Sequence, residues 1–493
     1  MVEHARVLVL AFATSRPGKD GGQRLRWVRM WMKKVWALIS ESLSGSEEQD
    51  YTAIGIRRAI VLLSIPMVLE MGMEALFALV DIFFVAQLGE VATATVGLTE
   101  TMMVPVYSIA WGLGMGATAV VARRTGEKNR PGARVAAAQS VLIALLIGLV
   151  VAIPAVIWSP EMLVLIGAGD DVRSVALPYT RLMLSSNLII MLLFVVNAVF
   201  RGAGNARMAL RTLALANGIN IVLDPLLIFG VGFFPELGVF GAAVATCTGR
   251  TIGVLYQLYH LTRKGGPFAI RLPDLRPVRD VLVGIIKISM GGMGQFLIAS
   301  LSWVFLVRIV AGFGTVAVAG YMVAFRIIIV TLLPAWGMAN AAATLVGQNL
   351  GAKQPDRAER SAWLCGHYNM FFMVTVMLFF WAAAPWIVSF FDQSPDADAF
   401  AILALRVVSM GYFFYGYGMV LAQALNGAGD SLTPTWLNVI CFWAVEIPLA
   451  YLLANSLHYG PIGVYASIAI SESLLAVLCA IIFRQGKWKL MKV

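Results

Sequence analysis

Three carboxyl side chains follow one face of the first long apolar segment of the chain. Glu70, Glu74 and Asp81 are separated by four and by seven residues, and at about 100° per residue of an α-helix they point within roughly 40° of one another. A carboxylate in the middle of a bilayer costs about 2.5–3.5 kcal/mol or more, so it normally faces a bundle interior and is a functional candidate. We expect this stripe to take part in ion chemistry. For Glu70 and Glu74, which lie towards one end of the segment, pairing with a buried arginine or capping of a broken helix is an equal alternative.

A second polar pair lies in a later apolar segment, where Asn220 and Asp224 are four residues apart and share a helical face. Two carboxylates in one low-dielectric pocket cannot easily both ionise. A proton or a sodium ion could therefore be captured between Asp81 and Asp224, with the amide oxygen of Asn220 and the hydroxyl of Thr246 as further hard ligands. The alternative is that each acid pairs with a buried arginine or caps a broken helix.

Other residues are placed to support this pair. Tyr179 and Asn197 are eighteen residues apart, so on an unbroken helix they share a face. Pro225 directly follows the second aspartate, and Pro66 lies four residues before the first glutamate. Because proline has no backbone N–H, we expect both helices to bend beside their acids.

The second half of the chain concentrates aromatic and methionine side chains, which suit flat, apolar, cationic ligands. The candidates for substrate contact are Tyr412, Tyr415, Trp336, Met338 and Trp443. Aromatic residues are also ordinary membrane-protein material, so this signal is weaker than the acids. For Glu446 and Glu472, together with Arg308 and Arg326, we expect an internal salt bridge rather than a second coupling site.

The elements that position these residues are membrane-spanning helices. Of the 493 residues, 59% are apolar and 13% are charged, against about 25% charged in a soluble protein, which excludes a soluble enzyme. The twelve predicted spans lie near residues 58–86, 92–122, 134–157, 173–199, 208–231, 238–262, 281–310, 316–347, 361–389, 400–425, 432–454 and 463–483. We expect an all-α polytopic membrane protein, without disulfides or zinc, because the four cysteines form no CxxC pair.

The basic residues indicate the orientation. Most lie in the loops after even-numbered spans and in the tail, whereas the other loops hold only Arg173 and several acids. By the positive-inside rule both termini are cytoplasmic, which predicts a multi-pass protein of the plasma membrane. The same distribution explains the net charge of +10, so no nucleic-acid partner is expected. We expect a monomer.

The first 50 residues alternate basic and aromatic side chains. These are Arg24, Arg26, Trp27, Arg29, Trp31, Lys33, Lys34 and Trp36. They predict either a short interfacial helix or a disordered leader, and the sequence does not separate the two.

An internal duplication with a constant offset of 225 residues divides the chain. Residues 201–205 (RGAGN) align with 426–430 (NGAGD), and Gly126 aligns with Gly351. Six spans in each half give both halves one orientation, so we expect two parallel, pseudo-symmetric lobes, an arrangement known from secondary transporters. Asp81 and Asp224 have leucines at their repeat positions, so the polar cluster belongs to the first half only. The predicted parts are an extension (1–57), a first lobe (58–262), a linker (263–280), a second lobe (281–484) and a tail (485–493).

The sequence resembles the multidrug and toxic compound extrusion family over residues 58–485. The motifs that carry the resemblance are Pro66, residues 80–89 (VDIFFVAQLG), 201–205 (RGAGN), 220–230 (NIVLDPLLIFG), 238–246 (GVFGAAVAT), 346–352 (VGQNLGA) and 423–429 (QALNGAG). The acid pair in spans 1 and 5 is similar to the DNA-damage-inducible-F-like branch. In that branch the resemblance implies that Asp81, Asn220, Asp224 and Thr246 bind the coupling cation, Na⁺ or H⁺. It also implies that Tyr179 and Asn197 complete the network and that Pro66 marks a bend.

Two departures from the family pattern bear on coupling. Glu74 stands where that branch has a glutamine, which adds a third titratable group to the candidate coupling residues. The other main branch keeps acids in spans 7 and 10, where this chain has Gln295 and the acid-free stretch 400–425. Coupling through the second lobe is therefore disfavoured.

We expect a secondary antiporter, not an enzyme, that exports organic, often cationic, compounds in exchange for H⁺ or Na⁺ by alternating access. It needs no cofactor besides the coupling ion, because no phosphate-binding loop of the G-x-x-x-x-G-K-[ST] type is present. The main alternative is a lipid-linked oligosaccharide flippase, which would need more Arg or Lys in the spans than Arg181, Arg250, Arg308 and Arg326. An intramembrane aspartyl protease is disfavoured because its GAGD sequences, at 167–170 and 427–430, lie in predicted loops.

Overall fold

The computed structural model describes residues 30, 33, 36–44, 49–266, 268–391, 394–491 and 493. The chain forms two compact units, Met1–Gly45 and Ser46–Val493. In the first unit residues 36–44 are helical, and Trp36 is 72% exposed. Most of the basic and aromatic residues for which an interfacial helix is predicted lie outside the described residues: Arg24, Arg26, Trp27, Arg29, Trp31 and Lys34.

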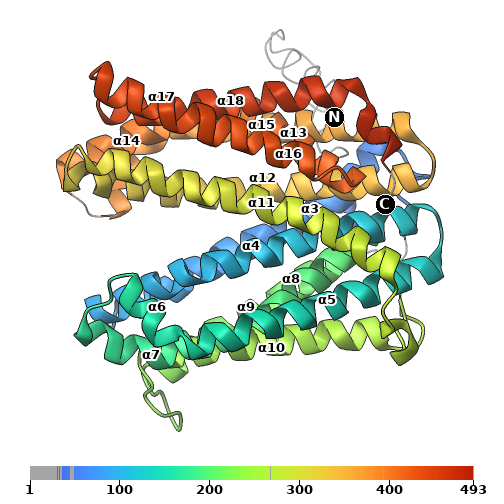
Figure 1. Cartoon of the computed structure of the whole chain (residues 1–493), viewed down its shortest axis with the longest axis horizontal. Helices are drawn as coiled ribbons and strands as arrows, with labels where there is room; N and C mark the ends of the chain where they lie inside the picture. The colour runs from blue at the N-terminus through green and yellow to red at the C-terminus, as the bar shows by residue number, and fades with distance from the viewer. Residues whose placement is uncertain are drawn as a thin grey trace, which may run out of the picture. The chain divides into compact units, whose positions relative to one another are not determined.

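In the described residues of the second unit, all regular secondary structure is helical. The helices of its first half are α3 (Ile56–Ala86), α4 (Glu90–Gly126), α5 (Arg130–Ile157), α6 (Ser159–Leu165), α7 (Asp170–Ser185), α8 (Asn187–Gly202), α9 (Ala206–Ile228) and α10 (Val239–Thr262). Those of its second half are α11 (Arg279–Ala311), α12 (Thr315–Gly351), α13 (Pro355–Val388), α14 (Pro395–Ser409), α15 (Tyr412–Ala428), α16 (Leu432–Asn438), α17 (Ile447–Tyr451) and α18 (Pro461–Gln485). We call α3–α10 the first lobe and α11–α18 the second lobe (Figure 1).

In the described part of the chain, nine helical segments are long and apolar enough to cross a membrane, and two bent pairs bring the number to eleven. The acid-bearing α3 is not among them. Counted with α3, the segments follow the twelve predicted spans in order, which confirms the all-α, two-lobed polytopic fold.

The structure corrects the fourth and tenth predicted spans, which are broken rather than continuous. The pair α7 and α8 bends by 41°, and the pair α14 and α15 bends by 60°. At the first break the hydroxyls of Ser185 and Ser186 donate to the carbonyls of Leu182 and Met183, each at 2.7 Å, which favours the end of a helix. Gly411 stands 225 residues after Ser186 at the second break, so the duplication includes the bend.

The two lobes pack on each other through their first two helices. The first-lobe helix α3 packs on the second-lobe helix α12, and α4 packs on α11. A pseudo-two-fold axis relates these two contacts, because α11 and α12 are the repeat counterparts of α3 and α4. α3 also packs on α9 of its own lobe. A movement of α3 would therefore change the helix packing in both lobes.

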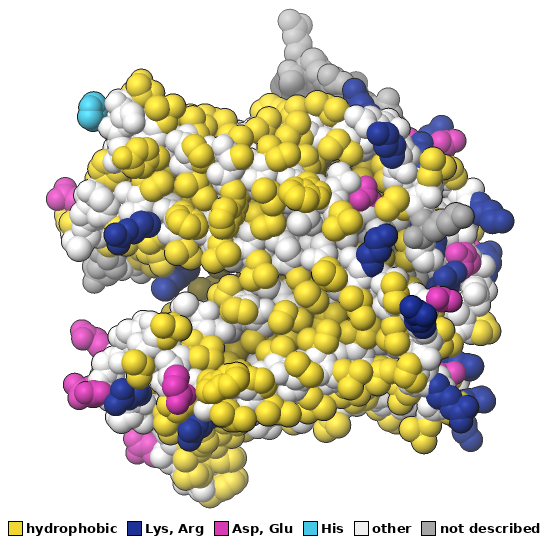
Figure 2. Space-filling view, viewed as in Figure 1, with side chains coloured by type: hydrophobic (Ala, Val, Ile, Leu, Met, Phe, Trp, Pro, Cys, Tyr) yellow, Lys and Arg dark blue, Asp and Glu magenta, His cyan; other side chains and the backbone are white. Residues whose placement is uncertain are grey.

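The lobes meet most closely where α4 and α12 end. A Cβ at Gly126 would collide with the carbonyl oxygen of Gln348, and a Cβ at Gly351 would collide with that of Arg123. The Gln348 side chain also donates from Nε2 to the carbonyl of Gly202 at 2.9 Å. Most Lys and Arg side chains visible in Figure 2 gather at this end, which we call the basic end, and a hollow separates the lobes at the opposite end.

Candidate functional site

A buried polar cluster lies between α9 and α10 of the first lobe. Asp224 is 0% exposed and Asn220 is 1% exposed. Asn220 donates from Nδ2 to Asp224 Oδ1 and to Thr246 Oγ1, both at 3.1 Å. The structure therefore brings together three of the residues that the sequence predicted as ion ligands.

Asp81 of α3 completes this cluster and lies within electrostatic range of Asp224. Three buried oxygens, Asp81 Oδ1, Asn220 Oδ1 and Asp224 Oδ2, have no hydrogen-bond partner among the described residues. Buried polar atoms without a partner are costly and are rare in native proteins. Two carboxyl groups, an amide oxygen and a hydroxyl are chemically suited to hold a proton or a hard monovalent cation.

A second group of charges, centred on Arg250 of α10, borders the cluster. Arg250 interacts electrostatically with Glu74, Glu100 and Tyr107, and its guanidinium lies 5.4 Å from the centre of the Phe77 ring. Glu74 therefore lies near a cation, which agrees with the alternative in which a membrane acid pairs with a buried arginine, although the sequence did not identify Arg250 as its partner. The sequence could have indicated Arg250, because Arg250 follows Thr246 by four residues and the two side chains therefore share a face of the helix.

Glu70 does not join the buried polar cluster. It is 1% exposed and forms an ion pair with Arg201 at the end of α8. Eleven residues of helix separate it from Asp81, which is about 16 Å along α3. Glu70 thus follows the alternative in which a membrane acid pairs with a buried arginine.

The expected pairing of Tyr179 with Asn197 on one helical face is wrong, because the helix breaks at Ser186 between them. Tyr179 is 3% exposed in α7 and lies within electrostatic range of Asp81. Asn197 lies in α8 and accepts a hydrogen bond from Gln257 Nε2. The helix α3 continues through Pro66, and α9 ends three residues after Pro225. A functional bend at either proline is still a prediction.

The aromatic candidates of the second lobe separate into two groups. Tyr412 and Tyr415 line a cavity inside the lobe, and Trp336 lies 5.2 Å from Trp111 of α4, measured between ring centres. Trp443 is 40% exposed and donates from Nε1 to the carbonyl of Ile298 at 3.0 Å. It therefore lies at the surface of the lobe. Met338 is half-buried two residues after Trp336.

The expected salt bridges of Glu446 and Glu472 do not form in the described part of the chain. Arg308 and Arg326 are both exposed. Glu446 instead accepts a hydrogen bond from Ser302 Oγ at 2.9 Å. An apolar environment therefore holds two carboxyl groups without a neighbouring cation.

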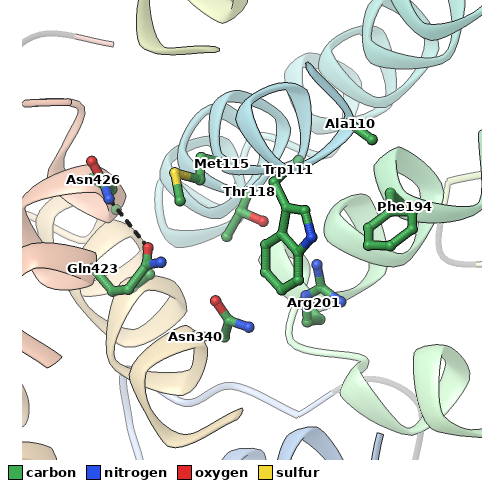
Figure 3. A pocket seen from close by; sticks show the side chains of 12 residues that line it. Ala110, Trp111, Met115, Thr118, Phe194, Arg201, Asn340, Gln423 and Asn426 are labelled. Atoms are coloured by element: carbon green, nitrogen blue, oxygen red, sulfur yellow. Dashed lines mark hydrogen bonds between the residues drawn. The ribbon is translucent and has the colours of Figure 1, made fainter. Parts of the chain in front are cut away.

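A pocket of about 400 Å³, including its opening, lies between the lobes. Trp111, Phe194 and Arg201 line it from the first lobe, and Gln423 and Asn426 line it from the second (Figure 3). The amide of Asn426 donates to Gln423 Oε1 at 3.3 Å. Sequence reasoning did not select these residues, although the first of the two GAG motifs follows Arg201 and the second follows Asn426.

Two pseudo-symmetric helical lobes, a pocket between them and a buried polar cluster in one lobe are the features of a membrane transporter, not of an enzyme. The chain belongs to the MatE family, whose model matches residues 66–226 and again residues 293–452. The two matches begin at nearly the same spacing as the internal repeat. They cover both lobes, so each lobe is one copy of the family unit.

Relatives and solved structures agree with this assignment. The chain is 25% identical over 437 residues to a probable multidrug resistance protein NorM of Thermotoga maritima, covering 88% of this chain and 93% of the relative. It is 27% identical over 425 residues to the FAD transporter of Shewanella oneidensis, covering 86% and 93%. A solved structure, titled as the outward-facing conformation of a multidrug resistance MATE family transporter, matches with a TM-score of 0.83 at 28% identity, covering 88% and 96%.

Proposed function

We propose that this chain is a secondary antiporter that exports organic, often cationic, compounds in exchange for H⁺ or Na⁺ and that it belongs to the DNA-damage-inducible-F-like branch. The observation that carries the proposal is the set of three buried oxygens, on Asp81, Asn220 and Asp224, that have no hydrogen-bond partner in the described part of the chain. A cation or a proton captured there would satisfy atoms that are otherwise costly to bury. Thr246 provides a further oxygen, and Tyr179 and Glu74 border the site.

The position of α3 links ion capture to the two lobes. A cation bound between Asp81 and Asp224 would draw α3 towards α9 and would change its packing on α12 of the second lobe. A ligand shifts a conformational equilibrium only through its different affinity for the two states. The ion must therefore bind more tightly when α3 and α9 hold their ligands together.

The proposed orientation of the chain in the membrane follows from charge. The positive-inside rule places the basic end in the cytoplasm, so the hollow between the lobes opens to the outside. Residues at both ends of the second unit lie at the basic end: Asp50 forms an ion pair with Lys128 at 3.1 Å, and Arg123 Nη2 donates to the carbonyl of Met491 at 2.7 Å. Both termini are then cytoplasmic, in the plasma membrane.

Efflux from proteoliposomes tests the proposal. The full chain should export a fluorescent organic cation when a proton gradient or a sodium gradient is imposed, and the gradient that works identifies the ion. The Asp81→Asn and Asp224→Asn variants should each lose most of this transport, whereas Asp171→Asn, at an exposed acid of α7, should transport normally. Normal transport by both of the first two variants would overturn the ion-site assignment, and no transport under either gradient would overturn the antiporter.

A further inference from the structure

Residues 486–493, which follow α18 of the second lobe, cross towards the first lobe at the basic end. They include a single 3₁₀ turn, Lys487–Leu490, and in Figure 1 the C-terminus lies beside the boundary between the lobes. Residue 492 lies outside the described residues. We call the described part of this segment, 486–491 and 493, the strap. Its contacts show which lobe holds each of its ends.

The beginning of the strap is anchored in the second lobe by a buried tryptophan. Trp488 is 1% exposed and belongs to a hydrophobic core cluster of that lobe. Its ring stacks on Phe483 of α18 with ring centres 4.5 Å apart, and its Nε1 donates to the carbonyl of Phe483 at 2.8 Å. Lys489 forms ion pairs with Glu359 at 2.5 Å and with Asp356 at 3.4 Å, both on α13. This part of the strap is therefore fixed without any help from the first lobe.

The end of the strap is held by two arginines of the first lobe. Arg123, in the last turn of α4, donates from Nη2 to the carbonyl of Met491 at 2.7 Å. The neighbouring Arg124 donates from Nη2 to the carbonyl of Val493 at 3.1 Å. Arg123 is only 8% exposed, so salt screens its contact less than it would screen one at the surface. One short segment is thus bound to both lobes at once.

The internal repeat shows what is particular to Arg123. Its counterpart in the second lobe is Gln348, 225 residues further along the chain. Gln348 donates to the carbonyl of Gly202 at 2.9 Å, and Arg123 donates to the carbonyl of Ala428 at 3.4 Å, so each side chain holds a GAG motif of the opposite lobe. A glutamine amide has two N–H donors, whereas a guanidinium has five. The arginine can therefore hold the strap in addition to the contact that both lobes share.

Separation of the lobes at the basic end would break the two arginine contacts with the strap. Alternating access requires this end to open as the hollow at the opposite end closes (Figure 2). The strap cannot follow α4, because Trp488 and Lys489 hold it to the second lobe. Hydrogen bonds to a charged group stabilise the state in which they are made. The strap therefore stabilises the state in which the basic end is closed.

We propose that the strap is a latch between the lobes, held by Arg123, and that it sets the balance between the closed and the open state of the basic end. The inference rests on the proposed function in so far as this opening is a step of transport. Arg123 is a positioning residue in this role, because it acts through the strap and is not among the residues that line the pocket between the lobes.

Distances between spin labels on the purified full chain test the proposal without a gradient. Labels at Thr262 and Arg360, exposed at the basic ends of α10 and α13, report separation of the lobes there. Labels at Val91 and Val316, exposed at the starts of α4 and α12, report closure of the opposite end. Arg123→Gln should raise the population with the basic end open by about tenfold, the change expected for one lost hydrogen bond to a charged group, and should shorten the Val91–Val316 distance.

A shortened chain separates loss of the latch from a general loss of packing. Removal of residues 491–493 takes away the carbonyls that the two arginines hold and leaves Trp488 and Lys489 in place. It should shift both distances as Arg123→Gln does, and the two changes together should add little, because they remove the same contact. Lys487→Gln, at an exposed position of the strap, is the matched control and should leave both distances unchanged.

The outcomes distinguish the latch from the antiporter. Unchanged distances in the shortened chain would overturn the latch, because Arg123 would then act through Ala428 alone. Fully additive shifts would also overturn it, since the two changes would act through separate contacts. If the variants shift the distances but the wild type exports nothing under either gradient, the antiporter proposal fails while the latch stands. If the wild type exports and the shortened chain keeps its distances, the latch fails while the antiporter stands.

Discussion

Glu70 of α3 and Arg201 at the end of α8 form a buried ion pair, in which the Glu70 side chain is 1% exposed and the Arg201 side chain 10% exposed. The pair holds the first helix of the lobe against its broken fourth span. Arg201 also lines the pocket between the lobes. Its repeat counterpart, Asn426, is neutral, so this ion pair is specific to the first lobe.

Replacing Glu70 by alanine should strongly destabilise the protein. Breaking a buried pair leaves an uncompensated charge and costs about 3–5 kcal/mol, so we expect a clear fall in the thermal unfolding midpoint in detergent. The double variant Glu70→Gln with Arg201→Gln should be less damaging than either single change, because contacting partners are not additive. Glu161→Gln, at an exposed acid of α6, is the control. An unchanged midpoint in Glu70→Ala would show that the pair contributes nothing to stability.

Alanine at Gly126 or Gly351 should force the lobes apart at the basic end. Each added Cβ meets a backbone carbonyl, and overpacking of this kind costs about 1–3 kcal/mol. Spin labels at Val91 and Val316, both 40% exposed at the starts of α4 and α12, should then move closer together as the opposite end closes. Gly97→Ala in α4, where an added Cβ has no neighbour within 4 Å, should leave the distance distribution unchanged. The same result for Gly126→Ala would contradict the expected coupling between the two ends.

Replacing Arg250 by glutamine should strengthen binding of the coupling cation. Arg250 contributes a positive charge within electrostatic range of Asp81 and Glu74. Its repulsion of a coupling cation bound at this partly buried site is worth a few kcal/mol at most. We expect several-fold tighter Na⁺ binding by titration calorimetry if Na⁺ is the ion. Arg326→Gln, at an exposed arginine of the other lobe, should have no effect. Weaker Na⁺ binding in Arg250→Gln would mean that this arginine orients the acids instead of opposing the ion.

Asp50 should make the fold weakly dependent on acid pH. The hydroxyl of Thr52 donates to its carboxylate and, with Lys128 nearby, holds the pKa of Asp50 below its ordinary value of 3.8. A lowered folded-state pKa adds stability above the ordinary value, and this stability is lost as the pH falls through the folded-state pKa. Because the group is partly exposed and screened, Asp50→Asn should cost less than about 1 kcal/mol near neutral pH. Thermal midpoints of the two proteins should converge in acid, and a constant difference would contradict this origin.

The buried polar cluster could be predicted in part because Asn220 and Asp224 lie within a single helix. Asn220 and Asp224 are one helical turn apart, and no break separates them, so the pattern of one segment fixes their common face. Asp81 was predicted to belong to the cluster because an acid buried in a membrane is costly and is therefore a functional candidate. Both arguments need only the local period and the hydrophobic environment.

The other features of the site depend on how the helices pack on one another, and the periodicity of the sequence does not reveal this packing. The break at Ser186 separated Tyr179 from Asn197, although the eighteen-residue spacing suits an unbroken helix. The partner of Glu74 is Arg250, which lies on a helix far along the chain. Trp443 has the right residue type for a ligand site, but its helix turns it to the surface. The duplication predicted the two lobes but not which of their faces meet.

The glycine contact between α4 and α12 affects how fast the protein could change conformation. At Gly126 and Gly351 backbone meets backbone, so at these two contacts no side chain stands between the helices, and the Gln348 hydrogen bond to the Gly202 carbonyl is a side-chain contact that must break before the lobes separate there. The activation barrier at this end would then arise mainly from lost dispersion contacts and from the rehydration of carbonyl groups. Because these contacts are individually small, they can break one after another along the crossing, and turnover need not wait for a single concerted rearrangement.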